Sequence, residues 1–261
     1  MTEPGIGRVT LVGGGPGSRE LLTLGAVEAL RRADVVLYDR LAPVEVLEEF
    51  CPDALHLDVG KRPGHHAVPQ HEIERLLVEH ALGGAHVVRF KGGDPYVFGR
   101  GGEEVLACRS AGVPVEVIPG VTSAVAVPAA SGVPLTHRGM SHAFTVISGH
   151  APLTASEYAH LAGLGGTIVV LMGANALPAL APGLVAAGLA ADTPAVVIER
   201  GYRRGQRTTF APLAELPVAA ARAAVRSPAV IVIGEVVRLA SGGDAEADAV
   251  LRQVGEDAIA P

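Results

Sequence analysis

Residues 12–18, Val-Gly-Gly-Gly-Pro-Gly-Ser, form the first stretch of the sequence whose composition could serve a ligand. They follow an apolar run and precede a helical pattern, and Asp39 comes about twenty residues later, as in a dinucleotide-binding fingerprint. The third glycine of that fingerprint falls on Ser18, and Pro16 lacks the N–H that a phosphate would need. Two interpretations stay open. The segment is a tight turn without a ligand, or its backbone closely approaches a neutral or cationic ligand, because glycine lacks Cβ.

Several polar residues lie where they could do chemistry, and each also has a structural interpretation. Asp39 ends an apolar run, where a carboxylate could accept a proton, but it could equally cap a helix or pair with Arg40. Asp94, in a Gly-Gly-Asp-Pro segment, is suited to a turn or to a ligand hydroxyl. Thr122 is a candidate helix N-cap. Residues 103–104, Glu-Glu, complement a helix dipole, and we assign them no chemistry.

The elements that must position these residues alternate between short apolar runs and helical periodicity. Such alternation predicts a largely parallel sheet with helices on its faces, and ligands bind at the carboxyl ends of such strands. In the first half of the chain, strands are predicted at residues 9–12, 35–38, 86–90 and 113–118, and helices at 20–32, 70–82 and 102–110.

A polar, turn-rich stretch at residues 134–142 separates this series from a second one. We expect two α/β domains with a ligand cleft between them, at residues 1–137 and 138–239, and a loosely ordered tail at 240–261. In the second series, strands are predicted at residues 144–147, 167–172, 195–199 and 229–233, a helix at 174–187, and an additional antiparallel strand at 207–210.

Composition limits the classes of protein that the chain can be. Hydrophobic residues make up 49% and charged residues 18%, which predicts a sizeable core. A net charge of −6 and only 3% aromatic residues argue against nucleic-acid binding. Two uncharged stretches, 117–136 and 167–191, contain repeated Pro and Gly, so we expect no membrane span. Two cysteines and no signal-like N-terminus favour reduced thiols in a cytoplasmic protein.

Taken in order, five segments carry a specific resemblance. They are residues 12–18 (VGGGPGS), 38–40 (YDR), 60–62 (GKR), 89–104 (RFKGGDPYVFGRGGEE) and 119–124 (PGVTSA), the last followed by 132–138 (GVPLTHR). This series resembles the uroporphyrinogen-III C-methyltransferases of the tetrapyrrole methylase family. The resemblance extends from about residue 8 to residue 239. The chain begins at the first methylase strand, so we expect it to lack the dehydrogenase and ferrochelatase of sirohaem synthases.

The resemblance implies methyl transfer from S-adenosylmethionine to C2 and C7 of uroporphyrinogen III, giving precorrin-2 and S-adenosylhomocysteine, in a homodimer without a metal. It implies that Asp39 is the proton acceptor and Lys61 the proton donor. Relatives often have Ile and Ala at positions 97 and 123. The residues matching the cofactor contacts are Pro16, Gly92, Gly93, Asp94, Val97, Thr122, Ser123, Met172 and Gly201.

A substrate with eight carboxylates requires cations, and the motif-bearing loops contain them. Adjacent histidines at residues 65–66 have no third ligand at a suitable spacing, so they do not indicate a metal site. We assign substrate binding to Arg40, Arg62, Lys91, Arg100, His137 and Arg138.

Three other functions remain open: a dinucleotide-dependent oxidoreductase, a non-catalytic tetrapyrrole carrier, and a methylase of another substrate. Cofactor titration would separate the first from a methylase. The sequence does not determine whether the product would feed sirohaem or cobalamin synthesis.

Overall fold

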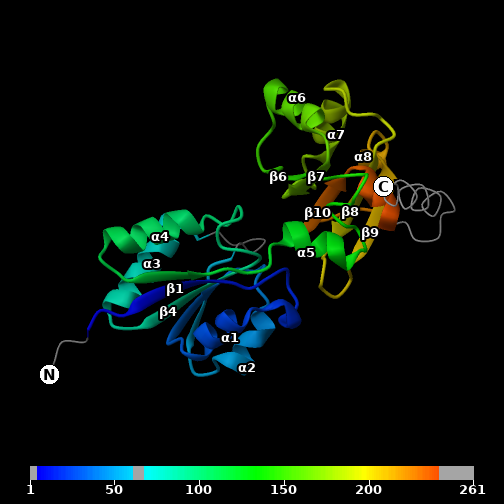
Figure 1. The fold of residues 1–261 in the computed structure, drawn as a ribbon. Helices are drawn as coiled ribbons and strands as arrows, with labels where there is room; N and C mark the ends of the chain where they lie inside the picture. The colour runs from blue at the N-terminus through cyan, green and yellow to red at the C-terminus, as the bar shows by residue number, and fades with distance from the viewer. Residues whose placement is uncertain (1–4, 61–67, 241–261) are drawn as a thin grey trace, which may run out of the picture. The chain divides into compact units, whose positions relative to one another are not determined.

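A computed structural model describes residues 5–60 and 68–240 of the chain (Figure 1). The predicted tail at 241–261 and the predicted site residues Lys61 and Arg62 lie outside the described residues. The chain divides into two compact units, Met1–Thr122 and Ser123–Pro261, each built on its own five-stranded sheet. This division lies about 15 residues before the boundary expected at 137/138, because residues 124–135 pack under the second sheet.

The first sheet is entirely parallel, with the strand order β3-β2-β4-β1-β5. This agrees with the alternation of strands and helices in the sequence. Its strands are β1 (Arg8–Gly13), β2 (Val35–Tyr38), β3 (Leu55–Asp58), β4 (His86–Lys91) and β5 (Val115–Ile118). Its helices are α1 (Leu24–Arg31), α2 (Leu47–Phe50), α3 (Gln70–Leu82) and α4 (Gly101–Ser110), with 3-10 turns η1 (Arg19–Leu21) and η2 (Val44–Val46).

Alternating side chains of these strands build two cores, one on each face of the sheet. Val9, Leu11 and Val87 pack with α3 and α4 on one face, whereas Val12 and Val88 pack with α1 and α2 on the other (Figure 1). Alternation along β4 therefore places residues 87, 89 and 91 on the α3 and α4 face. This arrangement sets the surroundings of the charged residues described below.

The first helix is shorter than the sequence predicted. A 3-10 turn, η1, occupies the start of the predicted 20–32 helix, and α1 begins at Leu24. Thr23 explains the break, because its hydroxyl accepts a hydrogen bond from the N–H of Ala26 at 3.1 Å and thereby caps α1. The helix predicted at residues 70–82 has the same bounds in the structure.

The second sheet is mixed, with the order β6-β7-β10-β8-β9. β6 and β7 are parallel, while β10 runs antiparallel between β7 and β8, and β9 is the predicted antiparallel strand beside β8. The strands are β6 (Phe144–Ser148), β7 (Thr167–Leu171), β8 (Pro194–Glu199), β9 (Arg207–Pro212) and β10 (Ala229–Ile233). The helices are α5 (Ser123–Ala130), α6 (Ala155–Leu164), α7 (Leu177–Ala186), α8 (Leu216–Arg222) and the 3-10 helix η3 (Glu235–Ala240).

Helices cover both faces of this sheet as well (Figure 1). Leu161 of α6, Leu180 of α7 and Leu216 of α8 lie in one core, and Val127 of α5 and Val236 of η3 lie in the other. No helix in the described part of the chain combines the length and the apolar character needed to cross a bilayer.

Candidate functional site

Three glycine-containing loops converge at the carboxyl edge of the first sheet, after β1, β4 and β5. Gly15 and Gly93 form an antiparallel bridge, with N–H to carbonyl distances of 3.2 and 2.7 Å. A Cβ on Gly120 would lie 2.4 Å from the carbonyl oxygen of Gly93, and one on Gly13 would lie 2.4 Å from the N of Gly120. Glycine is required at this junction because the three backbones leave no space for a side chain.

Asp94 joins two of these loops. Its Oδ1 accepts a hydrogen bond from the N–H of Tyr96 at 2.8 Å, and its Oδ2 accepts one from the N–H of Gly120 at 3.1 Å. The turn expected for Gly-Gly-Asp-Pro is therefore present, and the same carboxylate fixes the loop after β5. Each carboxylate oxygen can accept a further hydrogen bond, so this role is compatible with a ligand contact.

The electrostatic character of this junction distinguishes between the possible ligands. Residues 13–18, 92–98 and 119–122 contain no basic residue, and Asp94 is the one ionised side chain among them. Pro16 is buried and contributes no N–H, whereas Val97 is 36% exposed. These segments have no cation to bind a pyrophosphate, and Pro16 provides no N–H for one. A cationic sulfonium fits a carboxylate and closely approaching backbone without requiring a basic residue.

A charged network lies beside the junction, on the α3 and α4 face of the sheet. The Nη2 of Arg89 is 3.1 Å from Oδ1 of Asp39, and its Nε is 2.9 Å from Oε1 of Glu104. The Nζ of Lys91 is 3.1 Å from the same Glu104 oxygen. Arg89, Lys91 and Glu104 are buried, whereas 29% of the Asp39 side chain is exposed. The ion pair offered for Asp39 by the sequence therefore exists, with Arg89 rather than Arg40.

Charge balance explains how this network can be buried. Burial opposes the charged form of Arg89, but Asp39 and Glu104 outweigh it and raise the pKa of the guanidinium above its usual value. Burial, and next the charge of Arg89, lower the pKa of Lys91. Two cations and two carboxylates share the cluster, so no member is left without an opposite charge.

This network changes the interpretation of two sequence positions. Lys91, expected to bind substrate, is 3% exposed and paired with Glu104, so its ammonium does not project from the surface. Glu104, expected only to complement a helix dipole, is fully buried, and among the described residues its Oε2 has no hydrogen-bond donor. The strand period in β4 was the available signal, since it places Arg89 and Lys91 on one face.

Of the other predicted substrate-binding cations of the first unit, Arg40 and Arg100 lie within the described residues and Arg62 lies outside them. Arg40 is exposed after β2. Arg100 is exposed and pairs with Glu103 one turn away on α4, through its Nε at 2.9 Å. Arg100 and Phe98 have φ values of 58° and 51°, a left-handed conformation that costs energy for residues with a side chain.

The cofactor residues predicted in the second unit lie at the carboxyl ends of β7 and β8. Met172 follows β7 with a φ of 57° and is 48% exposed. Gly201 follows β8 and is buried, and a Cβ there would lie 2.5 Å from a methyl carbon of Val127 in α5. Gly201 thereby lies against α5, the helix that starts at Ser123. Both strands run antiparallel to β10, so their carboxyl ends share one edge.

Gln206 holds the turn after β8 against α5. Its Oε1 accepts a hydrogen bond from the N–H of Tyr202 at 2.9 Å, and its Nε2 donates to the carbonyl of Ala130 at 3.3 Å. No motif or periodicity in the sequence indicated this residue. The turn needs such support because Arg200 and Tyr202, on either side of the buried glycine, have φ values of 51° and 59°.

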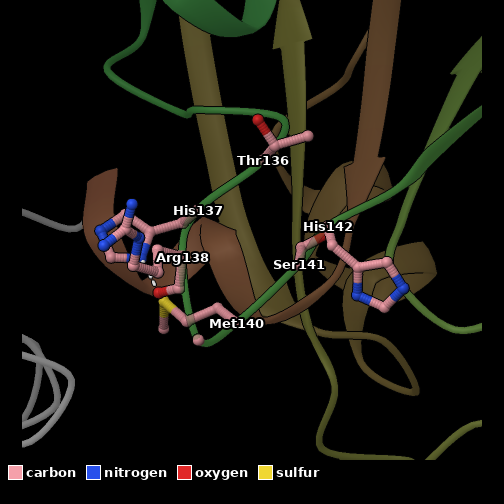
Figure 2. A pocket seen from close by; sticks show the side chains of 7 residues that line it. Thr136, His137, Arg138, Met140, Ser141 and His142 are labelled. Atoms are coloured by element: carbon pink, nitrogen blue, oxygen red, sulfur yellow. Dashed lines mark hydrogen bonds between the residues drawn. The ribbon is translucent and has the colours of Figure 1, made fainter. Parts of the chain in front are cut away.

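His137 and Arg138 belong to a short hairpin of the second unit, closed by a bridge between His137 and Ser141. Residues 136–142 line a surface hollow (Figure 2). Figure 2 shows the side chains of His137 and Arg138 together on one side of the hairpin, and that of His142 on the other. His137 Nδ1 lies 2.8 Å from the carbonyl oxygen of Arg138. The hairpin therefore presents an imidazole and a guanidinium side by side.

Acidic, cysteine and histidine side chains do not gather into a metal centre in the described ranges, 5–60 and 68–240. Both cysteines are buried free thiols. Burial raises the pKa of each thiol to about 11, so both are protonated at neutral pH and are unsuited to act as nucleophiles.

Two curated relatives illustrate what the chain is similar to. A protein named siroheme synthase from Tolumonas auensis is 46% identical over 245 residues, which cover 91% of this chain and 52% of that protein. A protein named S-adenosyl-L-methionine-dependent uroporphyrinogen III methyltransferase from Methanosarcina barkeri is 46% identical over 237 residues, covering 89% and 93%. The chain thus spans about half the length of the siroheme synthases that it matches, and nearly all of the archaeal protein.

Two solved structures resemble the chain. One is the uroporphyrin-III C-methyl transferase of Thermus thermophilus complexed with S-adenyl homocysteine, 46% identical, with a TM-score of 0.76 over 89% of this chain and 100% of that one. The other is a cobalt precorrin-4 methyltransferase, 26% identical, with a TM-score of 0.78 over 88% and 95%. A model of the tetrapyrrole (corrin/porphyrin) methylases matches residues 8–217. By this match and by the arrangement of its loops, the chain belongs to the tetrapyrrole methylase family.

Proposed function

We propose that the chain is an S-adenosylmethionine-dependent C-methyltransferase that methylates C2 and C7 of uroporphyrinogen III and forms precorrin-2. The identity of 46% with the Methanosarcina barkeri protein, over 93% of that protein's length, carries this proposal. The Thermus thermophilus structure supports it with equal identity and a bound demethylated cofactor.

Sequence identity to the uroporphyrinogen enzymes, rather than similarity of fold, supports this choice of substrate. The cobalt precorrin-4 methyltransferase has a TM-score of 0.78 but only 26% identity, so one fold serves methylases of different substrates. The residues 89–104, with their Lys-Gly-Gly-Asp-Pro segment, are the specific part of the resemblance to the uroporphyrinogen enzymes. The assay below therefore also tests whether the protein methylates a later corrin precursor.

The residues of the glycine junction fit the proposed cofactor, which supplies an electrophilic methyl group on a positively charged sulfur. In the first unit, Pro16, the Gly92–Gly93–Asp94 turn, Val97 and Thr122 would hold it through backbone atoms and one carboxylate. In the second unit, Ser123, Met172 and Gly201 are the proposed cofactor residues. Holding the reacting atoms in line contributes about 7–11 kcal/mol in well-oriented systems.

Asp39 is the proposed proton acceptor. Attack by a pyrrole carbon leaves positive charge on the macrocycle, which is relieved when a proton leaves for a base. Asp39 suits this step because its carboxylate is partly exposed and Arg89 donates a hydrogen bond to one of its oxygens. General base catalysis contributes roughly 10²- to 10⁴-fold. Lys61, outside the described residues, is the proposed proton donor.

Basic side chains are the proposed contacts to the substrate carboxylates, and among the described ones Arg40, Arg100 and Arg138 are exposed. Arginine matches a carboxylate with two parallel N–H donors, and histidine adds a shorter contact. Lys91 is better assigned to the buried network than to the substrate. The proposed substrate residues are thus Arg40, Arg62, Arg100, His137 and Arg138. We further propose a homodimer that works in the cytoplasm, as the family resemblance implies.

An anaerobic assay of the purified protein tests the proposal. With uroporphyrinogen III and S-adenosylmethionine, mass spectrometry should show two added methyl groups, and absorbance should follow formation of the methylated product. Asp39→Asn should lower kcat by about 10²- to 10⁴-fold. Cofactor binding with methylation of a later corrin precursor alone would overturn the substrate assignment. Absence of cofactor binding would overturn the methyltransferase assignment, and binding of a nicotinamide dinucleotide would favour an oxidoreductase.

A further inference from the structure

Arg89 connects the proposed base to the interior of the first unit. It lies on β4, where the side-chain period turns it toward α4, and only 2% of its side chain is exposed. Glu104 on α4 approaches it from inside the core, and Asp39, just after β2, approaches it from the site. A guanidinium buried between two carboxylates from different elements fixes the distance between those elements.

The donors of Arg89 leave its side chain little freedom. Its Nε is bound to Glu104, its Nη2 to Asp39, and its Nη1 lies 3.3 Å from the carbonyl oxygens of Leu37 and Phe90. The planar guanidinium has its donors in fixed directions, so these contacts set its orientation as well as its position.

The contact with Asp39 is one-sided. Among the described residues, hydrogen bonds to this carboxylate reach Oδ1 and leave Oδ2 without a donor. Within the described residues, the Arg89 cation therefore fixes one oxygen, and the other has lone pairs that can accept a proton. An ionised, oriented carboxylate is what a general base requires.

We propose that Arg89, anchored by Glu104, is a positioning residue that holds the Asp39 carboxylate in place and aimed during proton removal. This inference rests on the proposed function, because it assigns Arg89 a part in that reaction. Arg89 acts through Asp39 and does not itself contact substrate. A role confined to core stability would change folding and leave the chemistry of the folded enzyme intact.

A double-mutant cycle tests the inference. Arg89→Lys keeps the positive charge but loses the fork that joins the two carboxylates, so kcat of the folded enzyme should fall by about 10- to 100-fold, as misplaced catalytic groups do. The dissociation constant for S-adenosylhomocysteine should stay unchanged. In the Asp39→Asn background, Arg89→Lys should lower kcat by no more than about twofold, because residues that act as one unit are not additive.

A matched control and the opposing results complete this experiment. Arg75→Lys replaces an exposed arginine of α3 that pairs with Glu72 and Glu79, and it should leave kcat unchanged. An equal loss from Arg89→Lys in both backgrounds, or full activity of the single variant, would overturn the positioning role. Thermal unfolding of each variant reports how much protein is folded, so a folding defect is separated from a loss of turnover.

A spectroscopic readout separates failure of this inference from failure of the proposed function. In protein with ¹³C-labelled aspartate carboxyls, the Asp39 resonance is identified by its absence in Asp39→Asn. It should move in Arg89→Lys and stay in place in Arg75→Lys. If uroporphyrinogen III is not methylated but the resonance moves, the substrate proposal fails and the Arg89–Asp39 coupling stands. If the resonance does not respond, the positioning role is refuted whatever the substrate.

Discussion

Gly120→Ala tests whether the three-loop junction sets both the stability of the first unit and its affinity for a cofactor. The added Cβ would lie 2.4 Å from the Gly93 oxygen and 2.7 Å from backbone atoms of Gly13. Cβ atoms essentially never approach closer than 3.0 Å, so the loops must separate by about 0.6 Å or more. These obstacles are backbone atoms at the ends of paired strands, and no flexible side chain can move aside.

We expect Gly120→Ala to cost about 1–3 kcal/mol of unfolding free energy, as overpacking of well-packed sites does. At about 2–4 °C per kcal/mol for chains of similar size, Tm should fall by about 2–12 °C. Displacement of the loops should also weaken binding of S-adenosylhomocysteine by about tenfold or more, because close contacts tolerate little movement. Calorimetry measures both quantities, by thermal scanning and by titration.

Gly102→Ala is the matched control. Gly102 lies in the first turn of α4, and a Cβ there meets nothing within 4 Å. Alanine should therefore stabilise the protein by up to about 1 kcal/mol, since glycine is the poorer helix former. The reasoning about the junction is refuted if Gly120→Ala keeps the Tm and the cofactor affinity of the unaltered protein.

Three further predictions concern buried or half-buried titratable groups. Glu104→Ala removes the carboxylate that pairs with buried Lys91 and leaves buried Arg89 with Asp39 alone, so it should cost about 3–5 kcal/mol in urea unfolding. Glu103→Ala, next to it and exposed, should leave stability unchanged, and equal effects would contradict the burial argument. Burial lowers the pKa of His86 below its usual 6.5, so the unfolded chain binds the proton more tightly and stability should fall as pH drops below about 6.5. Denaturation at several pH values should show this slope flattened in His86→Asn, and an unchanged slope would exclude the assignment. Cys51 and Cys108, buried with thiol pKa values of about 11, should react with a disulfide reagent at pH 8 only after denaturant is added, and rapid labelling of the native protein would disprove their burial.

The buried network shows how a protein with a net negative charge can bury two cations next to the proposed site. Arg89 and Lys91 occupy consecutive positions on one face of β4, beside Val87 of the hydrophobic core. Their burial is possible because Glu104 enters from α4 and Asp39 from the end of β2. Removing either carboxylate would leave an uncompensated charge, so the site and the core share the same interactions.

Local patterns predicted most of the elements. The helix at residues 70–82 and the strands at 35–38 and 229–233 have the bounds that periodicity indicated. Periodicity did not predict the extent of an element where polar and apolar residues do not alternate. α5 has the sequence Ser-Ala-Val-Ala-Val-Pro-Ala-Ala, with a proline inside it and apolar residues on every side, so no amphipathic period marks it as a helix. The start of α5 was predicted by the N-cap expected at Thr122, whereas β3, which is short, was missing from the predicted elements.

The sequence by itself determined the alternation of strands and helices that indicates an α/β fold, the glycine-rich loops, and the motifs that resemble the family, because these depend on local periodicity and on motifs that are continuous in the chain. Only the tertiary structure decided which charges meet. Arg89 and Asp39 are 50 residues apart, and Arg89 and Glu104 are 15 apart. Their contact exists because β2 lies beside β4 and α4 packs on the face to which β4 turns its charged residues. Strand order and helix packing follow from the burial of the whole unit, so no local segment contains that information.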